Sequence, residues 1–200
     1  MKIKICGLSR ACDITYVNEA QPDFAGFVVN YPKSRRSVTP LQLSRLRENL
    51  AETVLPVGVF VNERPELVAQ LLNEGIISMA QLHGSEDEAY IRRLRTMTDR
   101  ELIQAFTIRS EADAKQAMQS AADYILLDNG KGTGERFDWR LVRETSRPWI
   151  LAGGLTPDNI RHAAETLHPW ALDLSSGVET DGYKDRDKIL AAVAGIRTLR

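Results

Sequence analysis

The chain has 200 residues, and its 26 lysines and arginines against 27 aspartates and glutamates leave a formal net charge of -1. This balance offers no attraction to nucleic acid or to a membrane surface, so an anionic ligand would have to be met by a local site. Hydrophobic residues make up 43% of the chain, enough for a buried core, but the apolar runs are too short to cross a bilayer.

The length favours a single domain over residues 1–200. The two cysteines, Cys6 and Cys12, lack the CxxC spacing of redox and metal motifs. We therefore expect a reduced, cytoplasmic protein. The three histidines show no metal-ligand spacing, and we expect no metal site.

Short β-rich runs alternate with helical runs eight times along the chain. Strands are expected at Lys2–Cys6, Phe24–Val29, Val54–Val61, Ser78–His83, Glu101–Phe106, Tyr124–Asp128, Trp149–Ala152 and Ala171–Leu174. The helices between and after them are expected at Arg10–Ala20, from Pro40, at Pro65–Asn73, from Ser85, from Ser110 to Ser120, from Asp138, from Pro157 and at Arg186–Leu199.

Local signals mark several helix ends. Thr39 is placed to cap the helix whose first residue is Pro40, a favoured position for proline. Gly75 is expected to end the third helix, and Ser110 to cap the fifth. Ser85, followed three residues later by Glu88, has the pattern of a capping box.

Alternating strands and helices predict a parallel sheet. Eight such units favour a closed (β/α)8 TIM barrel, with an open doubly wound sheet as the alternative. In a barrel the first and eighth strands pair in parallel. Alternation then turns Lys4 and Asp173 toward the interior, where we expect the two to approach, because a buried lysine needs an opposite charge.

Reactive groups of such barrels lie at the C-terminal ends of the strands. Two loops in that position have an anion-binding composition. One contains Gly153 and Gly154, after the seventh strand, and the other contains Ser175, Ser176 and Gly177, after the eighth. Glycine-bearing loops there turn backbone N–H groups toward a phosphate. The alternative is that these glycines only turn the chain.

Several motifs occur together and in order along the chain. They are Lys4-Ile-Cys-Gly7, Gly58-Val-Phe-Val-Asn62, Gln81-Leu-His-Gly84, Leu127-Asp128, Phe137-Asp-Trp139, Ala152-Gly-Gly-Leu155 and Asp173-Leu-Ser-Ser-Gly-Val-Glu179. As a set that extends from Lys2 to the final helix, they resemble the phosphoribosylanthranilate isomerase family.

This resemblance implies a (β/α)8 barrel that needs no metal or organic cofactor. It also implies an Amadori reaction of tryptophan biosynthesis, in which N-(5-phosphoribosyl)anthranilate becomes 1-(2-carboxyphenylamino)-1-deoxyribulose 5-phosphate. The family's general base falls on Cys6 and its general acid on Asp128. The pattern Tyr31-Pro-Lys-Ser-Arg-Arg36 places its anthranilate-binding arginine on Arg36.

The further substrate-binding residues expected are His83, Gly153, Gly154, Asp173, Ser175, Ser176 and Gly177. Asn62 and Gln81 are open candidates for the pocket lining. The structural alternatives are a packed cysteine, an aspartate that anchors a loop, and a hydrogen-bonded structural histidine. The loop Gly130–Gly134 is shorter than the family's usual glycine-rich stretch, which leaves its conformation open. The expected partner is the small phosphosugar-anthranilate substrate, with no nucleic acid or membrane, in a monomer or homodimer.

Three other functions compete with this interpretation. A pentose-phosphate epimerase would need histidines and acids on strand ends to hold a metal, and this chain lacks that set. A dual-substrate isomerase that also serves histidine synthesis would carry an aspartate where Cys6 stands. A barrel that only binds a phosphosugar would be indifferent to Cys6 and Asp128.

Overall fold

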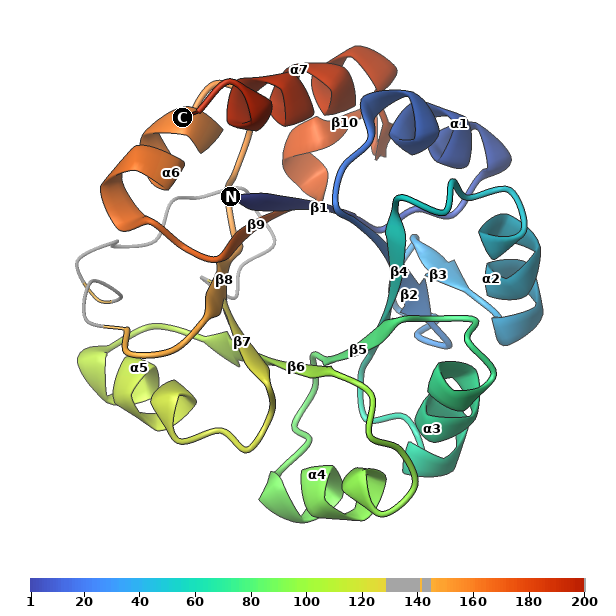
Figure 1. The fold of residues 1–200 in the computed structure, drawn as a ribbon, viewed down its shortest axis with the longest axis vertical. Coiled ribbons are helices and arrows are strands. Elements are labelled where there is room, and N and C mark those ends of the chain that lie inside the picture. The colour runs from blue at the N-terminus through green and yellow to red at the C-terminus, as the bar shows by residue number, and fades with distance from the viewer. Residues whose placement is uncertain (129–140, 142–144, 200) are drawn as a thin grey trace.

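The computed structural model of the chain describes residues 1–128, 141 and 145–199. Within these ranges, eight parallel strands form a ring with the helices outside it (Figure 1). The strands of the ring are β1 (Lys2–Cys6), β2 (Phe24–Val29), β4 (Leu55–Phe60), β5 (Met79–Leu82), β6 (Leu102–Thr107), β7 (Tyr124–Asp128), β8 (Trp149–Leu151) and β9 (Ala171–Leu174).

The outer helices follow the strands in the predicted order (Figure 1). They are α1 (Ala11–Ala20), α2 (Pro40–Arg47), α3 (Pro65–Asn73), α4 (Glu88–Arg95), α5 (Glu111–Met118), α6 (Ile160–Leu167) and α7 (Arg186–Arg197). None of the helices in the described ranges is long and apolar enough to cross a membrane.

Strand β1 closes the ring, because it pairs in parallel with β2 on one side and with β9 on the other. In the β1–β9 ladder Lys4 stands opposite Asp173, which is the predicted register. The closed barrel is thus confirmed, and the open sheet is excluded.

The strand alternation creates two apolar layers. One lies between the strands and the helices and contains most of the buried aliphatic side chains. The other fills the lower interior of the barrel. It contains one residue from each of β2 and β4–β9, namely Phe24, Val57, Met79, Ile103, Leu126, Ile150 and Ala171, together with Ala152 just after β8. Side chains from so many strands meet only inside a ring.

Two predicted caps are confirmed and one is wrong. The Thr39 side chain accepts a hydrogen bond from the Gln42 N–H at the start of α2, and Ser110 caps α5 in the same way. Helix α4, however, is capped by Asp87, not by Ser85. The Ser85 N–H and hydroxyl both donate to Asn62 Oδ1, so this residue belongs to the preceding loop and the helix begins after it.

Helix α6 also begins later than predicted, at Ile160 instead of Pro157. The cause is Asn159, whose side chain accepts from the Thr156 N–H and donates to the Gly154 carbonyl. These two bonds hold the preceding residues in a turn. The helix predicted from Asp138 and the loop Gly130–Gly134 lie outside the described residues.

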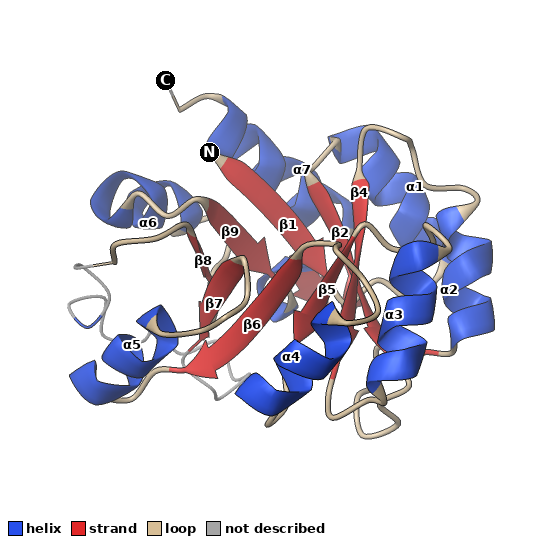
Figure 2. Ribbon diagram, turned by 60° about the horizontal axis from the view of Figure 1, so that its bottom comes forward, coloured by secondary structure: helices blue, strands red, loops and turns tan. Residues whose placement is uncertain are grey.

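Two short pieces of sheet were not predicted. Strand β3 (Ser37–Val38) pairs with the end of β2, and β10 (Glu179–Thr180) forms an antiparallel hairpin with β11 (Tyr183–Lys184). The hairpin follows the short 3-10 helix η2 (Ser176–Val178) after β9. Strand β3 lies beside the last two residues of β2, and the hairpin follows the C-terminal end of β9. Figure 2 shows the ring strands and the helices around them obliquely.

Candidate active site

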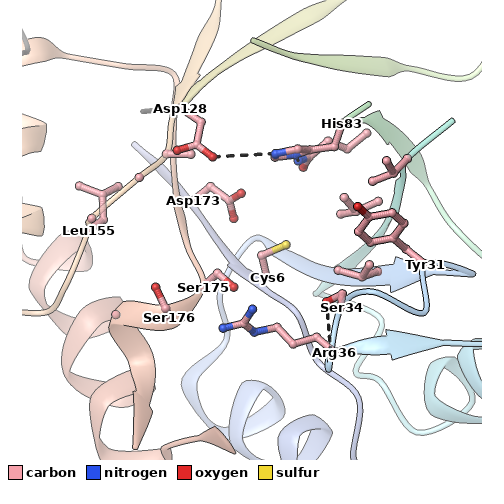
Figure 3. A pocket seen from close by; sticks show the side chains of 18 residues that line it. Cys6, Tyr31, Ser34, Arg36, His83, Asp128, Leu155, Asp173, Ser175 and Ser176 are labelled. Carbon is pink, nitrogen blue, oxygen red and sulfur yellow. Dashed lines mark hydrogen bonds and ion pairs between the residues drawn. The ribbon is translucent and has the colours of Figure 1, made fainter. Parts of the chain in front are cut away.

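A cavity of about 250 Å³ opens at the C-terminal ends of the strands. Every site residue expected from the sequence lines it, and Figure 3 shows how the side chains face one another. These residues are Cys6, Arg36, His83, Asp128, Gly153, Gly154, Asp173, Ser175, Ser176 and Gly177. The barrel therefore gathers residues from β1, β7 and β9 and from the loops after β2, β5, β8 and β9 in one place.

Cys6 ends β1 and is buried, with 8% of its surface exposed. Gly26 on β2 makes room for it, since a Cβ there would lie 2.8 Å from the Cys6 Sγ. Burial raises the pKa of the Cys6 thiol; the Lys4 ammonium lowers it and the Asp173 carboxylate raises it, and the net shift is upward. In the unliganded site Cys6 is thus a thiol at neutral pH, with a cation beside it that favours the thiolate.

Lys4 lies below Cys6 in the barrel and is 1% exposed. Its Nζ donates to Asp173 Oδ2 at 3.0 Å and to Gln81 Oε1 at 2.8 Å. Burial opposes the charge, but Asp173 and Cys6 together raise the pKa of Lys4. The predicted pair is confirmed. The second carboxylate oxygen, Asp173 Oδ1, is buried without a hydrogen-bond partner among the described residues.

Asp128 ends β7 and lines the cavity, and β8 and β9 separate it from Cys6 around the ring. Its Oδ2 lies 3.9 Å from His83 Nε2, as the dashed line in Figure 3 marks. The His83 side chain is 37% exposed, but its partial removal from bulk water by the surrounding barrel lowers its pKa and outweighs the attraction of Asp128. His83 is therefore neutral at the pH of most cells.

The hydrogen bonds below His83 determine which of its ring nitrogens carries the proton. An ammonium only donates, so the oxygen of Gln81 faces Lys4 and its NH2 faces His83 Nδ1, at 2.7 Å. Nδ1 must then accept, and the proton of neutral His83 is on Nε2, which faces Asp128. His83 therefore has both features that the sequence left as alternatives: it is held by a hydrogen bond within the barrel, and it lines the cavity.

Arg36 reaches the cavity from the loop after β2, and its side chain is 24% exposed. Its Nε and Nη2 donate to the two carboxylate oxygens of Glu179 at 2.6 and 2.7 Å. Because of these bonds, the pKa of Arg36 is raised further above its already high value. Gly7 permits this path, since a Cβ there would lie 2.4 Å from the Arg36 Cδ.

The two glycine-bearing loops pack against each other at the far end of the cavity. Gly153 and Gly154 have φ of 89° and 65°, in the region that favours glycine. A Cβ on Gly177 would lie 1.8 Å from the Leu155 carbonyl oxygen. Gly177 therefore allows two backbone segments to approach beside the cavity, whereas the positive φ of Gly153 and Gly154 is also what a turn of the chain requires.

Sequence reasoning left several site residues undetermined or missed them. Gln81 lines the cavity, whereas Asn62 lies outside its lining and binds Ser85. The space left by Gly26 and the carboxylate of Glu179 were not anticipated. Glu179 closes the motif that begins at Asp173, so its place in the sequence was visible but its partners were not.

The match to known proteins covers the whole barrel. A family model described as N-(5'-phosphoribosyl)anthranilate isomerase matches residues 3–194. The chain is 41% identical over 203 residues to the enzyme of this name from Endomicrobium trichonymphae, covering 99% of each.

Two solved structures have the same fold over 100% of both chains. A phosphoribosyl anthranilate isomerase in complex with reduced 1-(o-carboxyphenylamino)-1-deoxyribulose 5-phosphate has a TM-score of 0.87 at 35% identity. Monomers generated from the dimeric enzyme of Thermotoga maritima have a TM-score of 0.85 at 34% identity. Fold, site and sequence agree, and the chain belongs to the N-(5'-phosphoribosyl)anthranilate isomerase family of tryptophan biosynthesis.

Proposed function

We propose that this cavity performs the Amadori rearrangement with Cys6 as general base and Asp128 as general acid. The observation that carries the assignment is their arrangement: a thiol and a carboxyl group face one cavity from strands that are not neighbours. The reaction needs an acid and a base on different sides of one sugar, and this geometry supplies them.

The first step is opening of the furanose ring. Asp128 in its protonated form gives a proton to the ring oxygen, and the nitrogen at C1 forms an iminium. The Nε2–H of His83 faces the Asp128 carboxylate from 3.9 Å, so it lies where a negative charge develops as the proton leaves. That position favours the charged carboxylate in the transition state.

The second step removes the proton from C2, which the iminium has made acidic. Cys6 acts as the thiolate, and the resulting enolamine tautomerises to the ketone. Lys4 is the group that favours this thiolate, against the burial that opposes it. The catalytic form has an ionised Cys6 and a protonated Asp128.

The remaining residues are proposed to hold the substrate. Arg36 faces the anthranilate carboxylate, because a guanidinium matches a carboxylate in charge and shape. Backbone groups of Gly153–Gly154 and Ser175–Gly177 bind the phosphate. The buried Asp173 Oδ1, which has no partner among the described residues, accepts a hydrogen bond from a ribose hydroxyl.

The proposal extends to the setting of the enzyme. Its ligand is the small phosphosugar-anthranilate substrate, bound without metal or organic cofactor. A cytoplasmic monomer or homodimer stays an expectation, for which the named dimer of Thermotoga maritima offers a precedent in a relative.

Steady-state kinetics of Cys6→Ser and Asp128→Asn test the assignment. Each variant keeps the shape of its side chain but removes the ionising thiol or the transferable proton, so kcat should fall by about 10²- to 10⁴-fold. Substrate binding should persist, because phosphate and carboxylate are held elsewhere. A near-normal kcat in either variant, with the fold verified by circular dichroism, would remove that residue from the mechanism.

A further inference from the structure

A charged cluster lies beside the cavity, centred on Glu179 in the hairpin after β9. Among the described residues, three cations contact its carboxylate: Arg36 through two bonds, Arg35 Nη2 at 2.7 Å and Lys184 Nζ at 2.6 Å. The Glu179 side chain is 5% exposed and that of Lys184 is 1% exposed. The arrangement is therefore a buried, fully hydrogen-bonded carboxylate and not a solvated surface pair.

Glu179 stays ionised over the working range of the enzyme. Burial would raise its pKa, but the hydrogen bonds from Arg36 and Lys184 lower it to about 2. One negative charge faces three positive ones, so the cluster keeps an excess of positive charge next to the cavity. That excess suits an anionic ligand.

The contacts restrict Arg36 in particular. The two parallel bonds from its Nε and Nη2 hold the guanidinium plane in one orientation. The passage over Gly7 limits the rest of the side chain. Arg35 differs from Arg36 in both respects. It donates to the same carboxylate, but its side chain is 58% exposed and does not line the cavity.

The cluster also connects the two ends of the cavity. Lys184 Nζ donates to the Ser175 carbonyl at 2.9 Å as well as to Glu179, and the Lys188 Nζ donates to the Glu179 carbonyl at 2.7 Å. Ser175 begins the loop assigned to the phosphate. Glu179 thus joins the arginine loop after β2 to the phosphate loop after β9, 143 residues apart in sequence.

We propose that Glu179 is a positioning residue, which presents Arg36 to the carboxylate of the substrate and fixes its distance from the phosphate-binding loop. The inference rests on the proposed role of Arg36 and adds a residue that acts through it. Its consequence is specificity: a ligand is selected for two anionic groups at one separation.

Two simpler roles for Glu179 make different predictions. If it served only the net charge of the site, Glu179→Gln would add positive potential and tighten anion binding. If it served only the hairpin, the variant would lose stability but would treat ligands with and without a carboxylate alike. Positioning predicts weaker binding that is confined to the carboxylate.

The test uses two probes, reduced 1-(o-carboxyphenylamino)-1-deoxyribulose 5-phosphate and its counterpart without the carboxylate. Kd for both is measured for wild type, Glu179→Gln, Arg36→Ala, the double variant and the control Arg35→Ala. Glu179→Gln should bind the carboxylate probe about 10- to 100-fold more weakly, with the other probe changed less than threefold. Its KM for substrate should rise far more than its kcat falls.

The double variant and the control isolate the coupling. In the Arg36→Ala background Glu179→Gln should have little further effect, because the residue it positions is gone. Arg35→Ala should leave both affinities within about twofold of wild type, since that side chain lies on the outer side of the cluster.

Unchanged or tighter binding of the carboxylate probe by Glu179→Gln would overturn the inference, as would an equal loss for both probes. If Arg36→Ala itself does not discriminate the probes, the proposed role of Arg36 fails; if only Glu179→Gln does not, this inference alone fails. Should Glu179→Gln not fold, Glu179→Asp keeps the charge but shortens the reach, and the same carboxylate-specific loss is expected from it.

Discussion

The lower and upper halves of the barrel interior are built from the same strands but in opposite ways. The lower half is an apolar plug, in which Phe24 and Tyr124 pack against Trp170 with ring centroids 5.6 and 4.2 Å apart. The upper half, one or two residues further along the strands, holds a thiol, an ammonium, an amide and carboxylates. Along β2 the step from the apolar half to the polar half takes three residues: Phe24 belongs to the plug, and Gly26 already lies against the Cys6 Sγ.

The two halves show how one fold separates the residues that stabilise it from the residues available for chemistry. Burial of apolar surface in the plug stabilises the folded state, and the plug requires only side chains whose shapes fit together. The polar half costs free energy, since a buried ion pair is stabilising only when its geometry is good and its remaining atoms are bonded. Lys4 meets this condition with two bonds, whereas Asp173 keeps one oxygen unpaired among the described residues. A buried oxygen without a hydrogen bond costs stability, and we interpret this cost as the result of its proposed role in binding the substrate.

The largest effect on stability and activity together is expected from Lys4→Met, which removes the ion pair with Asp173. The variant leaves the Asp173 carboxylate buried without its cation, which typically costs about 3–5 kcal/mol of the free energy of unfolding. It also removes the cation that lowers the pKa of Cys6 most. Fewer molecules then carry the thiolate at neutral pH, so kcat/KM should fall by about tenfold or more.

Urea unfolding and steady-state kinetics measure the two effects of Lys4→Met separately. Unaltered stability would show that the pair is not the structural element described above. Unaltered kcat/KM in the folded variant would show that Lys4 does not act on Cys6.

Met79→Ala is the matched change in the apolar half. Met79 is 2% exposed and belongs to the plug, and truncation of such a side chain costs about 2–5 kcal/mol of stability. Because the cavity left behind lies below the polar half, kcat and KM should stay within about twofold at a temperature where the variant is folded. A large loss of kcat with little loss of stability would contradict the division of the barrel.

Gly177→Ala tests the polar half at the loop that is proposed to bind the phosphate. A Cβ there would meet the Leu155 carbonyl oxygen at 1.8 Å, so one of the two loops must move, at a cost of about 1–3 kcal/mol. KM should rise by roughly 10- to 100-fold, with a smaller change in kcat. The control is Gly195→Ala in α7, where the nearest atom lies at 3.8 Å. It should leave KM unchanged and raise stability slightly, since alanine favours a helix.

The smallest expected effect concerns acid stability. The pKa of Glu179 is about 2 in the folded protein against an ordinary value of 4.5, so its stabilising contribution is present above pH 4.5 and is lost as the pH falls toward 2. Glu179→Gln should therefore lower stability near pH 6 and lose less of it on acidification. Parallel stability curves for the two proteins between pH 6 and pH 2.5 would contradict this.

The elements that could be predicted from sequence are those with a local or periodic cause. Strand alternation set the interior register, so the approach of Lys4 and Asp173 followed from pattern and charge alone. The cap of α4 failed because both Ser85 and Asp87 are suitable residues, and a contact with Asn62, 23 residues away, decided between them. Local sequence does not contain that information.

For the candidate site, too, the sequence predicted which residues belong to it but not the contacts that each of them makes. Its residues were found at strand ends and in motifs, because the fold collects those positions at one face. The environment of each residue was not found. The proton on His83 Nε2 depends on Lys4 and Gln81 together, and the orientation of Arg36 depends on Glu179. Lys4 and Gln81, like Arg36 and Glu179, come from segments far apart in sequence, and Glu179 lies in a hairpin too short to show a period.

The pH dependence of kcat/KM, compared with the titration of the Cys6 thiol, tests the central claim most directly. The active form needs Cys6 ionised and the general acid protonated. Once the thiol is fully ionised, a further rise in pH can only remove the proton of the acid, so this form declines above the pKa of the thiol. Since burial raises the pKa of Cys6, the alkaline decline should lie above the ordinary thiol value of about 8.5.

Alkylation of the protein by iodoacetamide, in a Cys12→Ser background, reports the ionisation of Cys6 alone. The alkaline limb of kcat/KM and the alkylation midpoint should coincide, both above pH 8.5. A thiol that titrates more than one pH unit away from the kinetic limb, or a rate that does not decline after the thiol has ionised, would contradict Cys6 as the base.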